Sequence, residues 1–451
     1  MNLTDALRQV SVVGAAGKMG SGIALLLLQE MARQEAELTG QVGHGRYCLN
    51  LIDTQEEGLF ALRRHLRTQM TKYAEKQIHL LRQYYAGHPL LVSNEEIIHT
   101  FVQGACELIR LDHSLEWTRD STLVFEAIVE DVDIKVSLFK QLKQLSRTQT
   151  LYLSNTSSIP ISVLNEQAGL EGRLIGFHFY NPPPVQALVE LVFSSQTDPQ
   201  IESVVLELAK RLRKQVVKPR DVAGFIGNGY FMREIVFACQ QVRNLAKEMP
   251  LPEAIYLVNR VTQDFLLRPM GIFQLIDYVG IDVCSKIAHI MTKYLSPQIF
   301  LDDLVEQMVR LGVKGGQHAN GSQKDGFLQY DGQRIKGVYH PEEHRYHSIY
   351  SEGWINEVTQ KIGVKPSEEL TWKSLQGSSE RETQLSYYFK NLFASQTLGA
   401  TLAKSFLQRS RAIALDLVKD GAAVDSEDVN KVLKQGFFHL YGPVNSYERG
   451  D

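Results

Sequence analysis

An apolar run followed by a glycine-rich turn limits what the first part of this chain can fold into. Residues 10–13 read VSVV, residues 14–22 read GAAGKMGSG, and residues 23–33 have the composition of a helix. A strand, a glycine turn and a helix in this order let the backbone approach a pyrophosphate, with the helix N-terminus facing the negative charge. The order predicts the first unit of a doubly wound sheet that binds a dinucleotide.

A second apolar stretch, residues 47–52, ends in Asp53. A carboxylate at this place could accept both ribose hydroxyls and would repel a 2′-phosphate, so we expect NAD rather than NADP. The interval from Gly20 to Asp53 is longer than the usual ~20 residues, and we attribute the excess to an extended helix and loop over residues 34–45. The less favoured alternative is that the glycine turn only allows the helix to pack closely and binds no nucleotide.

Further strands and helices alternate along the chain. Residues 122–128 and 151–153 have the composition of buried strands, and residues 132–145 that of the helix between them. Such alternation is typical of a parallel sheet covered on both faces. We therefore expect an α/β, Rossmann-type, doubly wound parallel sheet, with the helical residues 56–100 as an excursion from it.

A small polar segment, NTSS at residues 155–158, follows the strand at 151–153. Ligands of doubly wound sheets bind at this carboxyl edge. Thr156 or Ser158 is expected to cap the helix that Pro160 begins. The hydroxyl of Ser157 is then left to point at a bound ligand.

The next strand, residues 174–177, is followed directly by His178, and Glu190 lies beyond the loop 181–184. An imidazole titrates near neutral pH, so it can take the proton of an alcohol as hydride leaves the same carbon. A carboxylate at Glu190 would fix the imidazole tautomer and stabilise the cation. A strand-end histidine alone is more often structural, but with the glycine loop and Ser157 it indicates an alcohol dehydrogenase.

Five short motifs follow one another: GKMGSGIA at 17–24, EAIVE at 126–130, SNTSS at 154–158, HFYNP at 178–182 and GFIGN at 224–228. In this order they resemble the L-3-hydroxyacyl-CoA dehydrogenase family. The segments RPMGIF at 268–273 and DYVG at 277–280 are also similar to that family. The likeness covers about residues 10 to 330.

The resemblance implies NAD-dependent oxidation of an L-3-hydroxyacyl-CoA to the 3-ketoacyl-CoA, in fatty-acid β-oxidation or a related acyl pathway. It implies His178 as the base, Glu190 as its partner, and Ser157 and Asn228 as hydrogen-bond donors to the reacting oxygens. Around the NAD it implies Asp53, Glu130, Lys135 and Asn181, in addition to the loop residues Gly14, Gly17, Lys18, Met19 and Gly20.

The chain departs from the family pattern at three places. Ala15 stands where the family usually has glycine, and its methyl group could crowd the pyrophosphate. Gly229 stands where the family usually has arginine; glycine in a helix costs about 1 kcal/mol relative to alanine, which indicates close packing. The helical excursion also diverges, and its basic residues are interpreted as a solvated face, with contact to the coenzyme A phosphates as the alternative: Arg63, Arg64, Arg67 and Lys72.

The C-terminal half has a helical pattern, and the resemblance implies an all-α domain there. We expect an NAD-binding domain at 1–221, a helical C-terminal domain at 222–331, a connector at 332–385 and a second, degenerate helical repeat at 386–451. The repeat is predicted from helices at 402–420 and 425–433 and from GFFHLYGP at 436–443, which is similar to residues 269–273. A repeat can bury a face that otherwise needs a partner subunit, so a monomer or a homodimer through the helical domains is expected.

Composition and charge also limit which classes of protein the chain can belong to. The net charge of −3 gives no general attraction for nucleic acid, and the longest aliphatic run, residues 24–28, is too short to span a membrane. No basic leader with an apolar core is present at the N-terminus, so a cytoplasmic protein without a membrane partner is expected.

No metal site is expected either. The four cysteines are scattered, and His340, His344 and His347 are interpreted as a solvated surface rather than a metal site. Two other functions remain open: a catalytically weakened scaffold or partner protein of the same fold, and a dehydrogenase of a simple hydroxy acid.

Overall fold

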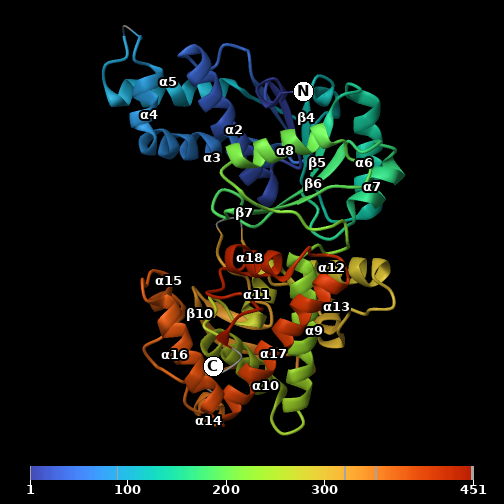
Figure 1. Cartoon of the computed structure of the whole chain (residues 1–451), viewed down its shortest axis with the longest axis vertical. Coiled ribbons are helices and arrows are strands. Elements are labelled where there is room, and N and C mark those ends of the chain that lie inside the picture. Colours follow the sequence, from blue (N-terminus) through green and yellow to red (C-terminus); the bar gives the residue numbers. More distant parts are fainter. Residues whose placement is uncertain (1, 89, 319–320, 351–352, 448–451) are drawn as a thin grey trace. The chain divides into compact units, whose positions relative to one another are not determined.

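The computed structural model describes residues 2–88, 90–318, 321–350 and 353–447 (Figure 1). The chain divides into two compact units, Met1–Asp221 and Val222–Asp451. The last four residues of the predicted repeat, 448–451, lie outside the described part. Each unit is considered by itself.

The first unit contains an eight-stranded sheet in the order β3-β2-β1-β4-β5-β6-β7-β8. The strands are β1 Gln9–Val13, β2 Cys48–Ile52, β3 Ile109–Asp112, β4 Leu123–Glu126, β5 Leu151–Ser154, β6 Leu174–Phe179, β7 Leu188–Val192 and β8 Gln215–Val217. The six strands from β3 to β6 are parallel. Their carboxyl ends therefore meet at one edge, which confirms the predicted Rossmann-type fold.

Strand β7 departs from the expected all-parallel sheet, because it pairs with β6 in the antiparallel direction. The loop 180–187 between them holds no helix. A parallel return needs a crossover connection of a dozen or more residues, whereas antiparallel strands need only a short loop. The turn places residues of β6 and β7 directly opposite one another near the carboxyl edge.

Helices flank this sheet (Figure 1). They are α1 Leu3–Ala6, α2 Lys18–Thr39, α3 Glu56–Lys76, α4 Ile78–Tyr84, α5 Asn94–Glu107, the short η1 Leu115–Thr118, α6 Val132–Leu145, α7 Ile161–Ala168 and α8 Pro199–Arg211. The length of α2 accounts for the long interval before Asp53, as expected. Helices α3, α4 and α5 pack on one another and on α2, and they form the predicted excursion.

The second unit is mainly helical. Its helices are α9 Gly227–Leu245, α10 Leu251–Arg260, the π-turn η2 Val261–Phe265, α11 Ile272–Val279, α12 Ile281–Tyr294, α13 Asp303–Arg310, α14 Ile355–Ile362, α15 Trp372–Gln376, α16 Arg381–Ala394, α17 Leu398–Lys419 and α18 Ser426–Gly436. One buried apolar cluster includes residues from Ala223 to Tyr441. The C-terminal extension therefore shares a core with the helices that precede it.

A three-stranded antiparallel sheet in this unit was not expected from the sequence. It consists of β9 Leu328–Asp331, β10 Arg334–His340 and β11 Arg345–Ser348. Charged and polar residues interrupt the apolar alternation of these strands, and in β10 only residues 337–339 are buried. The sequence signal for a strand is therefore weak in this segment, which spans the end of the predicted helical domain and the start of the predicted connector.

Two turns in the second unit have the same construction. A Cβ atom at Gly271 would lie 2.3 Å from the side chain of Asn259, and one at Gly442 would lie 2.2 Å from that of Asn430. Asn430 and Gly442 follow Asn259 and Gly271 at the same sequence interval. Each asparagine Oδ1 accepts a backbone N–H beyond its glycine, from Gln274 at 3.1 Å and from Val444 at 3.0 Å. These matching turns support the interpretation of an internal repeat.

Within the described residues, no helix is both long enough and apolar enough to cross a lipid bilayer.

Candidate active site

The glycine loop has no space for a side chain at Gly14 or Gly20. Gly14 has a φ of +82°, and a Cβ atom there would lie 2.6 Å from the carbonyl oxygen of Ala127. A Cβ atom at Gly20 would lie 2.0 Å from the carbonyl oxygen of Gly14. Ala15 is fully buried in the sheet core, so its methyl group does not face the outside of the loop. The expectation that Ala15 would crowd a pyrophosphate is therefore not supported.

The start of α2 has the features that a dinucleotide requires. Gly17 is the N-cap and no side chain caps the helix; Lys18 and Met19 form its first turn. Asp53, directly after β2, accepts the backbone N–H of Ala16 at 2.9 Å and that of Gln55 at 3.1 Å. The carboxylate is thus tied to the glycine loop, and these residues fit NAD: a helix N-terminus for the pyrophosphate and an acid for the ribose.

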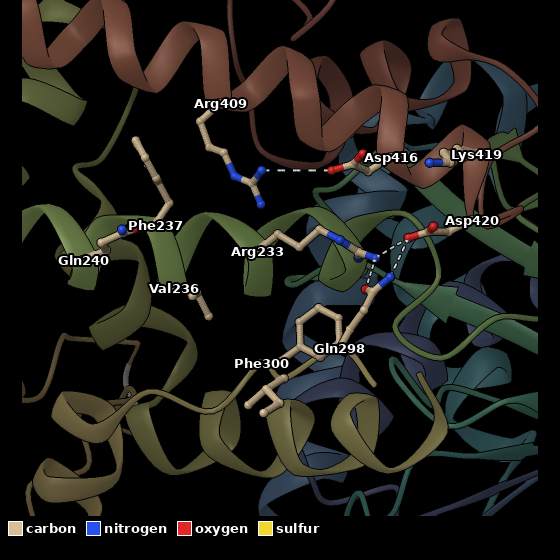
Figure 2. A pocket seen from close by; sticks show the side chains of 11 residues that line it. Arg233, Val236, Phe237, Gln240, Gln298, Phe300, Arg409, Asp416, Lys419 and Asp420 are labelled. Carbon is tan, nitrogen blue, oxygen red and sulfur yellow. Dashed lines mark hydrogen bonds and ion pairs between the residues drawn. The ribbon is translucent and has the colours of Figure 1, made fainter. Parts of the chain in front are cut away.

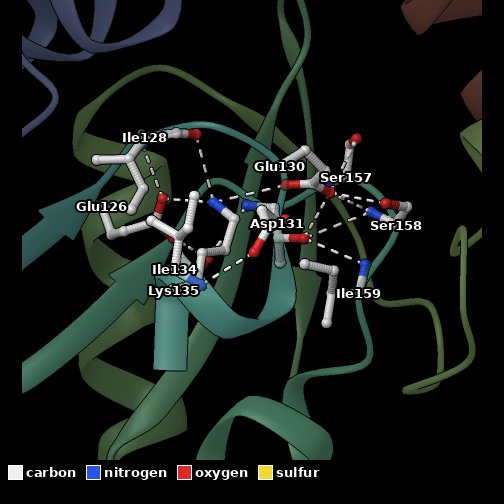
Figure 3. A network of polar contacts seen from close by, with 11 residues as sticks. Glu126, Ile128, Glu130, Asp131, Ile134, Lys135, Ser157, Ser158 and Ile159 are labelled. Atoms are coloured by element: carbon white, nitrogen blue, oxygen red, sulfur yellow. Dashed lines mark hydrogen bonds and ion pairs between the residues drawn. The ribbon is translucent and has the colours of Figure 1, made fainter. Parts of the chain in front are cut away.

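A buried charged network lies at the end of β4 (Figure 3). Lys135 on α6 is 1% exposed; its Nζ lies 2.5 Å from Glu126 Oε1 and 3.5 Å from Glu130 Oε2. Burial alone would lower the pKa of Lys135, but the two carboxylates outweigh it and raise the pKa. The lysine is therefore a fixed cation that holds two strand-end acids together.

Glu130 is bound by the polar segment after β5. Its Oε1 accepts the hydroxyls of Thr156 and Ser158, both at 2.7 Å, and the backbone N–H groups of Ser157 at 2.9 Å and Ser158 at 3.0 Å. Burial would raise the pKa of Glu130, but Lys135 and these donors lower it. The carboxylate fixes the backbone of Ser157 at the carboxyl edge (Figure 3).

The expectation that Thr156 or Ser158 caps the following helix is wrong. Both hydroxyls point to Glu130. The N-cap residue of α7 is Pro160, and its side chain makes no capping hydrogen bond. The Asp221 carboxylate instead accepts the backbone N–H groups of Ile161 at 2.5 Å and Ser162 at 2.7 Å. The capping group comes from a distant part of the sequence, which local spacing could not reveal.

His178 and Glu190 are directly opposite each other in the β6–β7 pair. His178 Nδ1 lies 2.8 Å from Glu190 Oε2. The side chain of His178 is 10% exposed and that of Glu190 is fully buried. A carboxylate can only accept here, so Nδ1 carries the proton, and the unprotonated Nε2 is the ring nitrogen that can act as a base.

Two further contacts fix this pair. The Tyr180 hydroxyl donates to Glu190 Oε2 at 3.0 Å. Asn155 Oδ1 accepts the backbone N–H of Phe179 at 3.0 Å, which ties the Ser157 segment to the end of β6. No local sequence pattern indicates the Tyr180 contact. Tyr180 lies two residues after His178 at the point where the strand ends, and its side-chain direction depends on the turn.

The remaining predicted residues are placed as follows. Asn181 follows Tyr180 in the loop after β6, ahead of Pro182, and is half-buried. Asn228 is the second residue of α9, in the second unit. Its contribution to substrate binding stays a prediction from the family resemblance.

A cavity of about 650 Å³ lies in the second unit, between α9, α17 and residues 298–300 (Figure 2). Arg233 donates to Asp420 at 2.8 Å and to Gln298 at 2.9 Å across it. None of the predicted site residues lines this cavity. The neighbouring Gly229 explains one family departure, because a Cβ atom there would lie 2.8 Å from Leu417 Cδ2 on α17.

One cluster has the residue types of a metal site. His340, Glu343 and His347 offer ligand atoms within 4.8 Å of one another. However, Arg345 Nε already lies 2.8 Å from Glu343 Oε2 and neutralises this carboxylate. Glu343 also lies 3.6 Å from His340 Nε2 and 3.1 Å from His347 Nε2.

A dinucleotide loop, an acid at the end of β2 and an imidazole–carboxylate pair at the same sheet edge define an NAD-dependent dehydrogenase. Residues 9–222 match the family description "3-hydroxyacyl-CoA dehydrogenase, NAD binding domain", and residues 224–325 match "3-hydroxyacyl-CoA dehydrogenase, C-terminal domain". The chain belongs to the 3-hydroxyacyl-CoA dehydrogenase family, and its cofactor is NAD.

Relatives with curated names agree with this assignment. A probable 3-hydroxybutyryl-CoA dehydrogenase of Deinococcus radiodurans is 35% identical over 46% of this chain and 72% of its own length. A 3-hydroxybutyryl-CoA dehydrogenase of Mycobacterium tuberculosis is 30% identical over 71% of this chain and 99% of its own length.

Solved structures show the same fold. FadB2 of M. tuberculosis is 29% identical, with a TM-score of 0.54, over 72% of this chain and all of that chain. A 3-hydroxybutyryl-CoA dehydrogenase of Escherichia coli K12 is 19% identical, with a TM-score of 0.62, over 97% of this chain and 90% of that chain. The second likeness concerns the fold alone, and it includes the C-terminal extension.

Proposed function

We propose that this chain oxidises an L-3-hydroxyacyl-CoA to the 3-ketoacyl-CoA with NAD, reversibly, in fatty-acid β-oxidation or a related acyl pathway. The observation that carries the proposal is the 2.8 Å contact between His178 Nδ1 and buried Glu190, at the edge where the Ser157 segment also ends. Family membership supplies the substrate class.

His178 Nε2 takes the proton of the substrate hydroxyl as the C–H bond breaks. NAD held by the glycine loop would supply the acceptor for the hydride that leaves the same carbon, so that the carbon–oxygen single bond becomes the carbonyl. Glu190 stabilises the imidazolium that forms, and it keeps the ring in the required tautomer. Ser157 and Asn228 donate hydrogen bonds to the substrate oxygens.

The cofactor would be held by the loop Gly14 to Gly20, with Asp53 on the adenosine ribose. Glu130, Lys135 and Asn181 would border the nicotinamide end. Glu130 and Lys135 act there mainly by fixing the strand-end loops, since most of their polar atoms are already bound to protein.

The proposal is tested with acetoacetyl-CoA and NADH. Wild-type protein should consume NADH, and His178→Gln should not, although it still binds NADH. Protein that binds NADH but is inert with acetoacetyl-CoA would contradict the proposal. Acetoacetate offered without coenzyme A should be a poor substrate; if it is turned over equally well, the enzyme is a dehydrogenase of simple hydroxy acids.

The scaffold alternative loses the support of two residue departures, Ala15 and Gly229. Ala15 is part of the sheet core, and Gly229 gives room to Leu417 of the extension. Each has a packing explanation that does not require lost catalysis.

The organisation of the chain is part of the proposal. We assign 1–221 to NAD binding, 222–331 to the first helical domain, 332–385 to a connector that contains strands β10 and β11 of the small sheet, and 386–451 to a degenerate repeat. The repeat buries a helical face within the chain, so a monomer or a homodimer is expected, in the cytoplasm. Light scattering on purified protein separates the two assemblies.

A further inference from the structure

Tyr180 and the catalytic histidine, His178, contact the same carboxylate oxygen of Glu190. Its hydroxyl lies 3.0 Å from Glu190 Oε2, the same oxygen that His178 Nδ1 approaches at 2.8 Å. The two rings are also neighbours, with centroids 5.0 Å apart and planes tilted by 40°. The imidazole and the phenol therefore contact each other and the same carboxylate.

Two donors on one carboxylate oxygen compete for its negative charge. A hydrogen bond to an ionised acid stabilises the anion. The acid then stabilises a neighbouring cation, here the imidazolium, less strongly. Burial raises the pKa of Tyr180 well above its ordinary value, and Glu190 raises it further. With its pKa raised, the phenol stays a neutral donor around neutral pH.

We propose that Tyr180 is a positioning residue of the His178–Glu190 pair: its hydroxyl fixes Glu190 Oε2 beside the imidazole and limits how strongly the carboxylate favours the imidazolium. It sets the pH at which His178 loses its proton, and thereby the pH range in which the alcohol is oxidised. This inference rests on the proposed function for its kinetic part only.

Other charged groups flank the pair on neighbouring elements. The Glu126–Lys135–Glu130 network lies at the ends of β4 and α6, and Lys214 lies before β8, where its Nζ is bound to the carbonyl oxygens of Pro183 and Gln186. These groups keep their own partners when the Tyr180 hydroxyl is removed. A change caused by that removal is therefore assigned to Glu190.

The test is Tyr180→Phe in the full chain, which keeps the ring and removes the hydroxyl. Without this donor, Glu190 stabilises the imidazolium more strongly. In the pH profile of kcat for alcohol oxidation, the rise on the acidic side should move to a pH higher by about half to one unit. KM and the affinity for NADH should stay nearly unchanged. The titration of the His178 ring, followed by NMR without substrate, should move in the same direction.

Two controls make the result specific. Tyr85→Phe removes another buried phenolic hydroxyl of the same unit, whose oxygen has no hydrogen-bond partner among the described residues, and it should shift neither profile. In a Glu190→Gln background, Tyr180→Phe should produce no further shift, because the shared anion is gone.

An unchanged pH profile and an unchanged ring titration in Tyr180→Phe would overturn the inference. A shift that persists in the Glu190→Gln background would also overturn it. The NMR measurement does not depend on turnover, so failure of the proposed activity and failure of this inference give different results.

Discussion

The hydroxyl of Tyr330 donates a hydrogen bond to the buried carboxylate of Asp277 at 2.8 Å. The same carboxylate accepts the backbone N–H groups of Phe327 at 2.7 Å and Leu328 at 2.9 Å. The segment at 277–280, which resembles the family, is therefore in contact with residues 327–330. Asp277 holds the start of the small sheet against α11, which is a structural role.

This contact predicts a pH-dependent stability. Burial raises the pKa of Asp277 to about 7, although the three donors oppose this. An unfolded aspartate titrates near 3.9, so between about pH 4 and 7 the folded state binds the extra proton. Stability should be highest at the acid end of this window and fall by at most roughly 4 kcal/mol as pH rises through it.

Urea unfolding across that window measures the slope. Asp277→Asn should abolish it, because the side chain no longer titrates, whereas Asp303→Asn, at an exposed position on α13, should retain it. An unchanged slope in Asp277→Asn would show that the pH dependence arises elsewhere.

Glu130→Gln tests the network of Figure 3. The variant keeps an acceptor for the 156–158 segment but removes the charge that Lys135 and four donors share. Hydrogen bonds to charged groups contribute about 1.5–3 kcal/mol, so NADH affinity should fall by roughly tenfold or more. Fluorescence titration measures it, with Glu166→Gln, an exposed acid on α7, as the matched control. Equal affinity in both variants would mean that Glu130 does not organise the cofactor edge.

Gly229→Leu tests the packing of the C-terminal extension. The new side chain must displace Leu417, whose Cδ2 would lie 2.8 Å from a Cβ atom at position 229. Overpacking of this kind typically costs 1–3 kcal/mol, and urea unfolding should show a loss of about that size. The double variant Gly229→Leu/Leu417→Ala should recover part of it. Purely additive losses would place the two residues in independent environments.

The sequence predicted elements well where the local signal was strong. Helix α6 was expected at 132–145 and spans Val132–Leu145. The antiparallel β7 and the sheet β9–β11 were missed, because pairing partners and burial, not local composition, define these strands. Within the helical pattern of the C-terminal half, Gly280, with a φ of +110°, separates helices α11 and α12.

The candidate site was predictable to the extent that its motifs are contiguous. His178 and Glu190 were paired from their spacing across one loop, and the antiparallel register brings them within 2.8 Å. Asp221 as the cap of α7 and Tyr180 as the second donor to Glu190 were not expected. Both depend on how the chain returns after a turn.

The most direct test of the His178–Glu190 pair is turnover of acetoacetyl-CoA by Glu190→Gln, together with its affinity for NADH. Loss of the carboxylate removes the group that orients and stabilises the imidazolium, so kcat should fall by roughly 10²-fold or more, while NADH binds nearly as in the wild type. A Glu190→Gln variant with full turnover would contradict the paired roles on which the proposed mechanism depends.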